Sequence, residues 1–445
     1  MMRKYLILLP GLFFIQACAV ITGLKITQTL PTYTAEVEQV IPPAAVLSST
    51  PTPTLPLPLP QVNPSGKPAP RFASLRMFTN DTGWAVGAEP EAAQLIFRTQ
   101  DGGYNWTYAG PPQLDAIPVG TNAHAYFLDA EHAWVSYYPA VAPANGPSSV
   151  WRTQDGGLSW MPGFTPPPHP DIPDYAFEGL YFSDPQTGWL MLAHSPGAGH
   201  APVSLFRSRD AGAHWETLLD PFEGQADRLH TCCRGGMLFV DRQNGLVAYA
   251  GGPYTAPMVH ITRDGGSTWR SIELPLADPE EFEGAACGSE SLSQLSGSKV
   301  ALVVSCFDLE RLEPGSLANL YISEDAGMSW RSLPLPEEPF EGSASGNLQR
   351  EYHVQFIDAQ NGWLFLQVQD WSQGETPVVH TSLYQTQDGG SLWTPRARLN
   401  WIGEFSFSDP LNGWAITRLG DDLGLLRTQD GGGSWIPLNP VLPEE

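Results

Sequence analysis

Residues 99–106 read Thr-Gln-Asp-Gly-Gly-Tyr-Asn-Trp, and this stretch decides the fold because its pattern, Ser/Thr-x-Asp-x-Gly-x-x-Trp, occurs seven times. The aspartates of successive copies are separated by 54, 55, 54, 61, 63 and 42 residues. A unit repeated about every fifty residues is typical of the blades of a β-propeller. The repeated residues are Asp101, Asp155, Asp210, Asp264, Asp325, Asp388 and Asp430, with Trp106, Trp160, Trp215, Trp269, Trp330, Trp393 and Trp435.

A second motif, Phe-x-Asp-x-x-x-Gly-Trp, precedes nearly every copy of the first. It is complete at 182–189, 356–363 and 407–414, altered at 127–134 and 239–246, and read as one residue shorter at 78–84. The fifth unit keeps only the shortened turn at 295–300. Aromatic and β-branched runs bounded by Gly, Pro, Asn and Asp surround both motifs and predict four short strands in each unit. We therefore predict an all-β fold, a seven-bladed β-propeller of four-stranded antiparallel blades.

The residue types of the first motif suit a tight turn. The aspartate is expected to accept hydrogen bonds from backbone N–H groups of its own turn, and the Ser/Thr hydroxyl to add another. The second glycine supplies a positive φ, and the tryptophan anchors the turn as a large apolar plug. A carboxylate committed to its turn is a poor catalyst, so we assign all seven aspartates a structural role rather than catalysis or metal binding.

The first motif resembles the Asp-box of sialidase-type repeats. Its pairing with the second motif is similar to the propellers of the photosystem II assembly and stability factor family, over roughly residues 72–440. This resemblance implies a scaffold that assists assembly of a membrane complex. The chain departs from that family's arginine-rich binding patch, because its own loops are acidic. Sortilin-type receptors and some glycosidases also carry Asp-boxes, so the motif identifies a blade and not an activity.

Composition excludes several function classes. The 445 residues include 23 Lys and Arg against 47 Asp and Glu, a net charge of −24, which disfavours nucleic acid as a partner. The 44 Gly and 43 Pro fit a turn-rich closed β fold. The sequence contains no Walker loop, His-Glu-x-x-His or Gly-x-Ser-x-Gly motif. We expect a monomer without a cofactor or a dedicated metal site.

The N-terminus predicts export. Arg3 and Lys4 precede an apolar run at 5–15 that is too short to span a bilayer, and residues 15–18 resemble a bacterial lipobox. The resemblance implies a lipidated Cys18 and an extracytoplasmic protein anchored to a bacterial membrane, with simple cleavage as the alternative. We divide the chain into a signal peptide (1–17), a Pro-rich tether (18–71), the propeller (72–440) and a tail (441–445). The tether is either an extended spacer or plain disorder.

Four further cysteines, Cys232, Cys233, Cys287 and Cys306, suggest disulfides in an oxidising compartment. Three connectivities are possible. Because a vicinal pair rarely bonds to itself, we favour links from Cys232 and Cys233 to Cys287 and Cys306, which would join blades 4 and 5. A zinc site would need better ligand spacing than these four residues have.

The two motifs occupy turns on one face of the predicted propeller, so the variable connections lie on the opposite, variable-loop face, where a rigid scaffold usually displays function. Candidate binding residues in these connections are Tyr137, Tyr138, His194, His200, Asp370, Trp371 and Glu375. A recurring Phe-Glu-Gly adds Glu178, Glu223, Glu283 and Glu341. These glutamates could surround the channel mouth and hold a cation or a basic partner segment, or form a solvated acidic rim.

Two functions from different classes follow. The first is an exported, membrane-anchored, non-enzymatic propeller that binds a protein partner or membrane complex through its variable-loop face. The second is a glycoside hydrolase or carbohydrate-binding propeller, with Glu178, Glu223, Asp370 and Glu375 as carboxylates and Trp371 or Tyr138 as a sugar platform. The Phe/Tyr-Arg-Ile-Pro tetrapeptide of sialidases is absent from the sequence, and no acid–base pair stands out.

Overall fold

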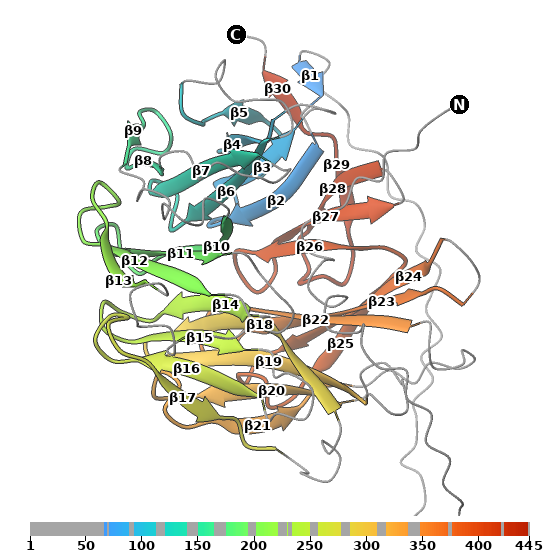
Figure 1. Ribbon diagram of the computed structural model, residues 1–445. Coiled ribbons are helices and arrows are strands. Elements are labelled where there is room, and N and C mark those ends of the chain that lie inside the picture. The colour runs from blue at the N-terminus through green and yellow to red at the C-terminus, as the bar shows by residue number, and fades with distance from the viewer. Residues whose placement is uncertain are drawn as a thin grey trace, which may run out of the picture. The chain divides into compact units, whose positions relative to one another are not determined.

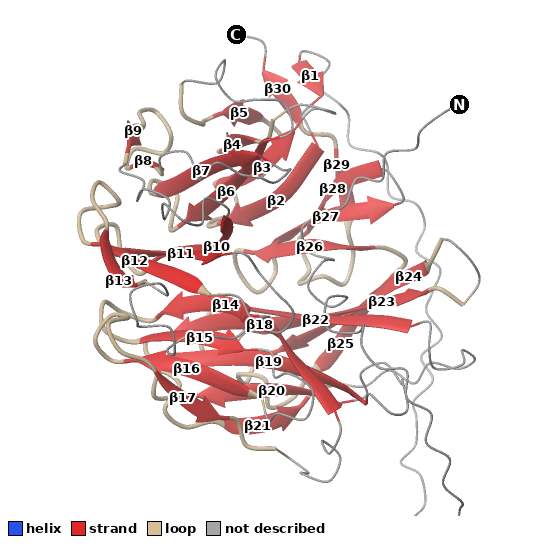
Figure 2. Ribbon diagram, in the orientation of Figure 1, coloured by secondary structure: helices blue, strands red, loops and turns tan. Residues whose placement is uncertain are grey.

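The computed structural model describes residues 66–68, 71–88, 93–112, 121–139, 150–163, 175–194, 202–220, 229, 234–249, 257–276, 285–308, 317–336, 348–372, 376–419 and 422–443. All regular structure in these ranges is β-strand (Figure 2). Within them, no helix is long and apolar enough to cross a membrane.

The strands form seven antiparallel four-stranded meanders, which confirms the predicted propeller (Figure 1). Blades 1 and 2 consist of β2 (Arg71–Met77), β3 (Gly83–Ala88), β4 (Leu95–Thr99), β5 (Trp106–Tyr108), β6 (Thr121–Phe127), β7 (Ala133–Pro139), β8 (Trp151–Thr153) and β9 (Met161–Pro162). Blades 3 and 4 consist of β10 (Tyr175–Phe182), β11 (Gly188–His194), β12 (Val203–Ser208), β13 (Glu216–Leu219), β14 (Arg234–Phe239), β15 (Gly245–Tyr249), β16 (Met258–Thr262) and β17 (Arg270–Glu273).

The remaining three blades follow the same order. They consist of β18 (Ala285–Ser296), β19 (Lys299–Asp308), β20 (Leu317–Ser323), β21 (Arg331–Pro334), β22 (Leu348–Phe356), β23 (Gly362–Asp370), β24 (Val378–Thr386), β25 (Thr394–Leu399), β26 (Ile402–Phe407), β27 (Gly413–Leu419), β28 (Asp422–Thr428) and β29 (Ile436–Leu438). The first strands of most neighbouring blades contact one another, so the first strands are the innermost ones and line the channel of the ring.

Blade 1 corrects one reading of the second motif. Met77 pairs with Gly83 as Phe182 pairs with Gly188, so the blade 1 turn has the same length as the others and is not one residue shorter. Thr79 takes the place of the aspartate. Its hydroxyl oxygen accepts hydrogen bonds from the backbone N–H groups of Asp81 (3.2 Å) and Thr82 (2.9 Å). Because a threonine replaces the aspartate of the motif here, the sequence pattern alone gave the wrong register for this copy.

The two motifs interlock between blades, which explains why they occur together. The indole N–H of Trp189 donates to the carbonyl of Gly265 in the next blade's Asp-box (2.9 Å), and its ring stacks 3.5 Å from that of Phe239. Equivalent hydrogen bonds join Trp134 to Ala211 and Trp363 to Gly431, with stacking on the next blade's phenylalanine. Each of these contacts buries an aromatic ring between two sheets and satisfies its only polar atom.

The same contact closes the ring. Trp414 of blade 7 donates its indole N–H to the carbonyl of Gly102 in blade 1 (2.8 Å), and the Met77 backbone N–H donates to the Ser406 hydroxyl oxygen (2.9 Å). Each blade supplies its own four strands, without a swapped strand among the described residues. A separate two-stranded sheet pairs β1 (Gly66–Pro68) with β30 (Val441–Pro443), segments that the sequence had assigned to the tether and the tail.

Candidate functional site

The Asp-box turns contain the hydrogen bonds that the sequence predicted. In blade 4 the Thr262 hydroxyl donates to the Asp264 carboxylate (2.8 Å) and accepts from the Gly266 N–H (2.8 Å), while the Thr268 N–H donates to the same carboxylate (2.8 Å). All seven copies repeat the Ser/Thr-to-Asp bond. The box carboxylates are therefore already occupied within their own turns.

These hydrogen bonds also affect the acidity of box aspartates. A hydrogen bond from the Ser159 hydroxyl lowers the pKa of Asp155. At Asp264 partial burial opposes the shift, but donors from its own turn still hold the pKa below its usual value. The same direction applies to Asp210, Asp325, Asp388 and Asp430. An aspartate that stays ionised and fully hydrogen bonded is poorly suited to general acid catalysis.

The box tryptophans differ in their exposure. Trp106 and Trp160 are buried, and the other five are half-buried. Trp106 donates its indole N–H to the carbonyl of Gly103 in its own turn (3.0 Å), whereas Trp160 donates to Ala109 of the preceding blade (2.9 Å). These side chains act as the apolar plugs that the sequence predicted.

Several predicted loop residues lie in strands instead. Tyr137 and Tyr138 belong to β7, and Tyr137 is 5% exposed. His194 ends β11, is buried, and lies 2.7 Å from the Ser204 hydroxyl. Glu178 is in β10 at a bulge between Phe177 and Gly179, not in a connection. The sequence assigned these residues to connections because the strands extend further than their apolar runs indicate.

Blade 6 retains one exposed candidate. Asp370 ends β23, is 7% exposed, and accepts a hydrogen bond from the Ser372 N–H (2.8 Å), so its carboxylate is engaged by its own turn. Trp371, the next residue, is 39% exposed. Val378, which opposes Asp370 across the strands, is 57% exposed.

The other predicted residues fall outside the described part of the chain. These are Cys18, His200, Glu223, Cys232, Cys233, Glu283, Glu341 and Glu375. Of the four Phe-Glu-Gly glutamates only Glu178 is described, so a ring of glutamates at the channel mouth stays a prediction.

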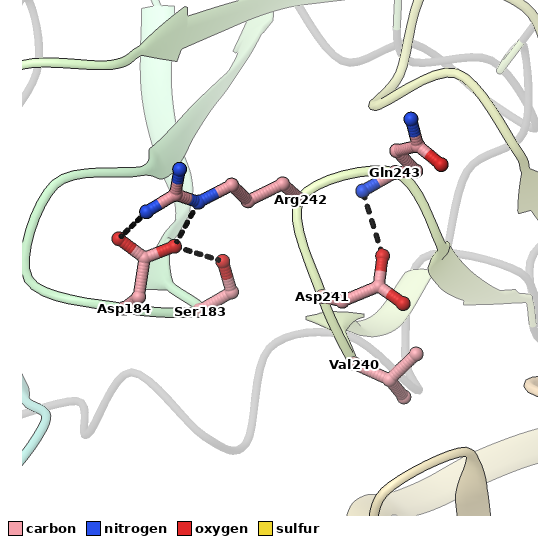
Figure 3. Close-up of a pocket in the computed structure, with 6 residues that line it drawn as sticks. All are labelled: Ser183, Asp184, Val240, Asp241, Arg242 and Gln243. Carbon is pink, nitrogen blue, oxygen red and sulfur yellow. Dashed lines mark hydrogen bonds and ion pairs between the residues drawn. The ribbon is translucent and has the colours of Figure 1, made fainter.

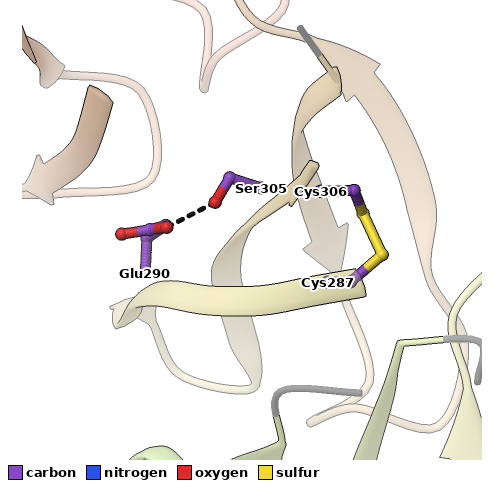
Figure 4. The surroundings of a disulfide bond; sticks show 4 residues. All are labelled: Cys287, Glu290, Ser305 and Cys306. Atoms are coloured by element: carbon purple, nitrogen blue, oxygen red, sulfur yellow. Dashed lines mark hydrogen bonds between the residues drawn. A yellow bond between two sulfur atoms is a disulfide. The ribbon is translucent and has the colours of Figure 1, made fainter. Parts of the chain in front are cut away.

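The preferred cysteine pairing is wrong. Cys287 bonds to Cys306, its direct cross-strand partner in the β18–β19 hairpin, with the two Cα atoms 4.0 Å apart (Figure 4). The bond therefore staples one hairpin of blade 5 and does not link blades 4 and 5. Residues opposed in an antiparallel pair have the short separation that a disulfide needs.

A group of charged side chains that no motif indicated lies on the innermost strands of blades 5 to 7. We call it the channel cluster: Glu290 of β18, Glu351 and His353 of β22, and Glu404 of β26. The ring nitrogen Nε2 of His353 lies 3.6 Å from the Glu351 carboxylate. The Ser305 hydroxyl donates to the Glu290 carboxylate (Figure 4). Among the described residues, no three His, Cys, Asp or Glu side chains are grouped closely enough to hold a metal ion.

Electrostatics within the channel cluster favour a charged histidine. Burial alone would lower the pKa of His353, but the carboxylates of Glu351, Glu290 and Glu404 outweigh this effect and raise it. Burial raises the pKa of Glu290. A carboxylate beside an imidazole favours its charged form.

A signal for part of the channel cluster was present in the sequence. His353 and Glu404 each lie three residues before the phenylalanine that ends the strand, Phe356 and Phe407. Because the motif sets the strand in the same register in each blade, equal offsets place side chains at the same level of the channel. Aligning the first strands on that phenylalanine would have placed the two residues at the same level.

An open pocket of about 590 Å³ lies on the motif face, between the turns of blades 3 and 4 (Figure 3). Its lining includes Asp184 and Arg242, whose guanidinium Nε lies 2.8 Å from the carboxylate. The backbone N–H of Gln243 donates to Asp241 (2.7 Å). Its charged groups are thus engaged by one another or by their own turn, and the pocket lies where two adjacent turns meet.

Comparison with solved structures finds other propellers. YCF48 from Cyanidioschyzon merolae is 14% identical with a TM-score of 0.44, over 73% of this chain and 88% of that chain. A structure of YCF48 bound to a D1 peptide is 16% identical with a TM-score of 0.41, over 72% and 82%. The GH74 xyloglucanase from Xanthomonas campestris is 15% identical with a TM-score of 0.33, over 84% and 74%. At these identities the likeness concerns the fold alone.

Comparison by sequence finds one curated relative at a significant level, a xyloglucanase from Paenibacillus sp. It is 31% identical over 141 residues, which is 31% of this chain and 13% of the relative. The matched segment thus spans only a small part of that enzyme. No family model matches the chain.

Proposed function

We propose that this protein is a non-enzymatic propeller that binds a protein partner through its variable-loop face, at the ends of the long strands of blades 5 and 6. The supporting observation is the exposure of Trp371 and Val378 at the end of β23 and the start of β24, in a blade whose β23 is otherwise almost wholly buried. Exposed aromatic residues on rigid elements are frequent anchors of protein interfaces. The opposite face consists of repeated turns whose carboxylates are already hydrogen bonded.

Blades 5 and 6 are built to hold such a surface rigidly. Strands β18 and β19 are 12 and 10 residues long, and β22, β23 and β24 are nine residues each. The Cys287–Cys306 bond fixes the β18–β19 pair near the end that faces the variable loops. A preorganised surface loses little entropy on binding, which favours recognition by a scaffold.

The proposal includes export and membrane attachment through a lipidated Cys18, based on the N-terminal sequence. Metabolic labelling with a fatty-acid probe tests this part separately. Labelling of the wild-type chain that disappears in Cys18→Ser supports the anchor, and an unlabelled wild-type chain contradicts it. The narrower function, assembly of a membrane complex, follows the resemblance in the motifs. The structure of YCF48 with a D1 peptide concerns that protein, and for this chain we propose only peptide or protein binding.

Site-specific photocrosslinking of the full-length chain in its native cells tests the location of the surface. A photoreactive residue at Val378 probes the proposed surface. The same residue at Leu158, which is 87% exposed in a blade 2 Asp-box turn, is the matched control on the motif face. We expect one discrete protein adduct from Val378 and none from Leu158. Adducts from Leu158 alone would contradict the proposal.

Once the partner is identified, Trp371→Ala measures the anchor. A central aromatic residue contributes about 2 kcal/mol or more to binding, so we expect Kd to rise roughly 30-fold. Leu392→Ala, at a residue 68% exposed in the blade 6 Asp-box turn, is the control and should leave Kd unchanged. Equal affinities for wild type and Trp371→Ala would refute the role of this side chain.

The second candidate is a carbohydrate-binding or glycoside-hydrolysing propeller, which the 141-residue likeness to a xyloglucanase favours. Trp371 would then stack on a sugar ring, while Asp370 is poorly placed as an acid or base because its own turn engages it. Incubation with β-glucan oligosaccharides separates the two functions. Saccharide binding or cleavage that Trp371→Ala abolishes, without a protein adduct at Val378, would establish the second candidate.

A further inference from the structure

We propose that the ring opens most readily at one junction, between blades 2 and 3, where an alanine of one blade keeps an arginine of the other from a hydrogen-bond partner. The arginine is Arg152 of β8, and the alanine is Ala211 in the Asp-box of blade 3. At three other junctions the corresponding residues are arginine and glycine, and the two fit together. This inference concerns the propeller itself and does not depend on which partner it binds.

An arginine directly precedes the Ser/Thr of the Asp-box in four blades, and in three of them its guanidinium binds the next blade. Nη1 of Arg98 donates to the carbonyl of Gly156 (3.0 Å), and Nη1 of Arg207 donates to the carbonyl of Gly265 (3.1 Å). Arg427 of blade 7 likewise donates to a backbone carbonyl of blade 1 (3.5 Å). Hydrogen bonds from a charged donor are stronger than neutral ones, so these arginines hold neighbouring blades together.

These contacts require a glycine as the first residue after the box aspartate. A Cβ atom on Gly156 would clash with Nη1 of Arg98, and one on Gly265 would lie 2.5 Å from Nη1 of Arg207. A methyl group and a guanidinium therefore cannot share this position. In blade 3 the methyl group is present, because Ala211 replaces the glycine and is buried.

Arg152 shows the consequence of this substitution. Its Nη1 atom is buried and has no hydrogen-bond partner among the described residues. The carbonyl of Gly265 accepts from both Trp189 and an arginine, whereas within the described ranges the printed donor to the Ala211 carbonyl is the indole N–H of Trp134 (2.7 Å). A buried donor without an acceptor costs free energy, so this junction is weaker than its neighbour.

Two further features lower the stability of the same junction. Ala211 has a φ of 61°, a conformation that costs an alanine more than a glycine. In blade 2, β8 pairs with β7 at three positions and with β9 at two, whereas β23 and β24 of blade 6 pair at nine. Segments with few ladder hydrogen bonds open at lower cost, which places the weakest part of the ring beside Arg152.

Blade 5 provides a control within the same chain. Ala326 also replaces the first glycine of its box and has a φ of 56°. The residue of blade 4 that corresponds to the arginine is Ile261, whose side chain has no polar group to satisfy. Among the seven boxes, alanine therefore meets arginine only between blades 2 and 3.

Hydrogen exchange of indole N–H groups tests the proposal, because these groups donate across the junctions. In the full-length chain with isotope-labelled tryptophan, NMR follows Trp134 between blades 2 and 3 and Trp189 between blades 3 and 4, and Trp→Phe variants assign the signals. We expect the indole of Trp134 to exchange about tenfold faster than that of Trp189. Ala211→Gly should admit the guanidinium and slow exchange at Trp134 about tenfold, with the rate at Trp189 unchanged.

Urea unfolding separates the arginine from the backbone conformation. Ala211→Gly and Ala326→Gly both remove a left-handed alanine, but only the first satisfies a guanidinium, so it should raise the midpoint more. Equal midpoint shifts would overturn the role of Arg152. Equal exchange rates at Trp134 and Trp189 would overturn the weak junction, as would a Trp134 rate that Ala211→Gly leaves unchanged.

Discussion

The closure of the ring can be tested at one indole. Trp414 is fully buried, donates to the Gly102 carbonyl (2.8 Å), and lies beneath the Arg427 guanidinium at 5.0 Å from its ring centroid. Trp414→Phe keeps an aromatic ring between blades 7 and 1 but removes the donor. The matched variant is Trp189→Phe, which deletes the same contact, to Gly265 at 2.9 Å, in the interior of the ring.

The structure sets the size of the effect. Gly102 is buried, so its unpaired carbonyl costs about 1–3 kcal/mol. The smaller ring leaves a void of roughly 40 Å³, which adds about 1 kcal/mol. For the unit from Pro60 to Glu445, an unfolding entropy of about 2.1 cal/mol/K per residue converts each kcal/mol to roughly 1.2 °C. We therefore expect Trp414→Phe to lower Tm by about 2–5 °C.

Scanning calorimetry of wild type and both variants measures the shift. Equal shifts would show that the junction of blades 7 and 1 is held like any other. A drop below about 1 °C for Trp414→Phe beside a normal drop for Trp189→Phe would refute the reasoning, since the ring would then be closed mainly by the β1–β30 pair. Small shifts in both variants would show that the hydrogen bond between the motifs contributes little.

Two further predictions concern the disulfide and the Asp-boxes. Cys287→Ser with Cys306→Ser should lower the free energy of unfolding by roughly 3 kcal/mol for a sequence separation of 19, and reductant should bring the wild type to the same urea midpoint. An unchanged midpoint would contradict this. Asp264→Asn should destabilise the protein more at pH 7 than at pH 3, because a carboxylate with a lowered pKa loses its stabilisation as the pH falls through the folded-state value. A midpoint difference as large at pH 3 as at pH 7 would contradict it.

The sequence was sufficient to predict the hydrogen bonds that form within a single turn. Thr262, Asp264 and Gly266 complete their hydrogen bonds within five residues, so residue types and spacing were enough to derive the turn. The bond from Trp189 to Gly265 spans 76 residues, and nothing in either motif alone indicates it. The number of blades and the strand order follow from the repeat. The way in which one blade holds the next becomes visible only when the sheets are placed side by side.

The cysteine pairing was missed although the sequence contained its geometry. Cys287 and Cys306 are equally distant from the turn near Gly297, so they oppose each other once the hairpin forms. The repeat assigned residues 295–300 as a turn between two strands, and counting outward from it leads to the pair. The preference for a bond between blades came from the expectation that the vicinal pair Cys232 and Cys233 does not bond to itself, which carries no information on register.

The channel cluster lies at positions where the repeat does not fix the residue type. The Asp-box has the same residue types in all seven blades, and the second motif has them in most blades, because these turns contact the neighbouring blade. Three residues before the end of the first strand the residue type differs from blade to blade. Blades 1, 2, 3, 4, 6 and 7 have at this position Ser74, His124, Gly179, Gly236, His353 and Glu404.

Residues at the same register position in successive blades lie around one level of the channel. Differences in residue type between blades at that position are therefore differences around that level. The side chains at that level can therefore change from blade to blade without loss of the fold. His353 and Glu404 occupy this level in blades 6 and 7, and Glu290 of blade 5 lies beside a bulge of β18 between Ser289 and Ser291. The repeated turns thus hold the blades in one register, while the residues at this level of the channel differ in charge from blade to blade.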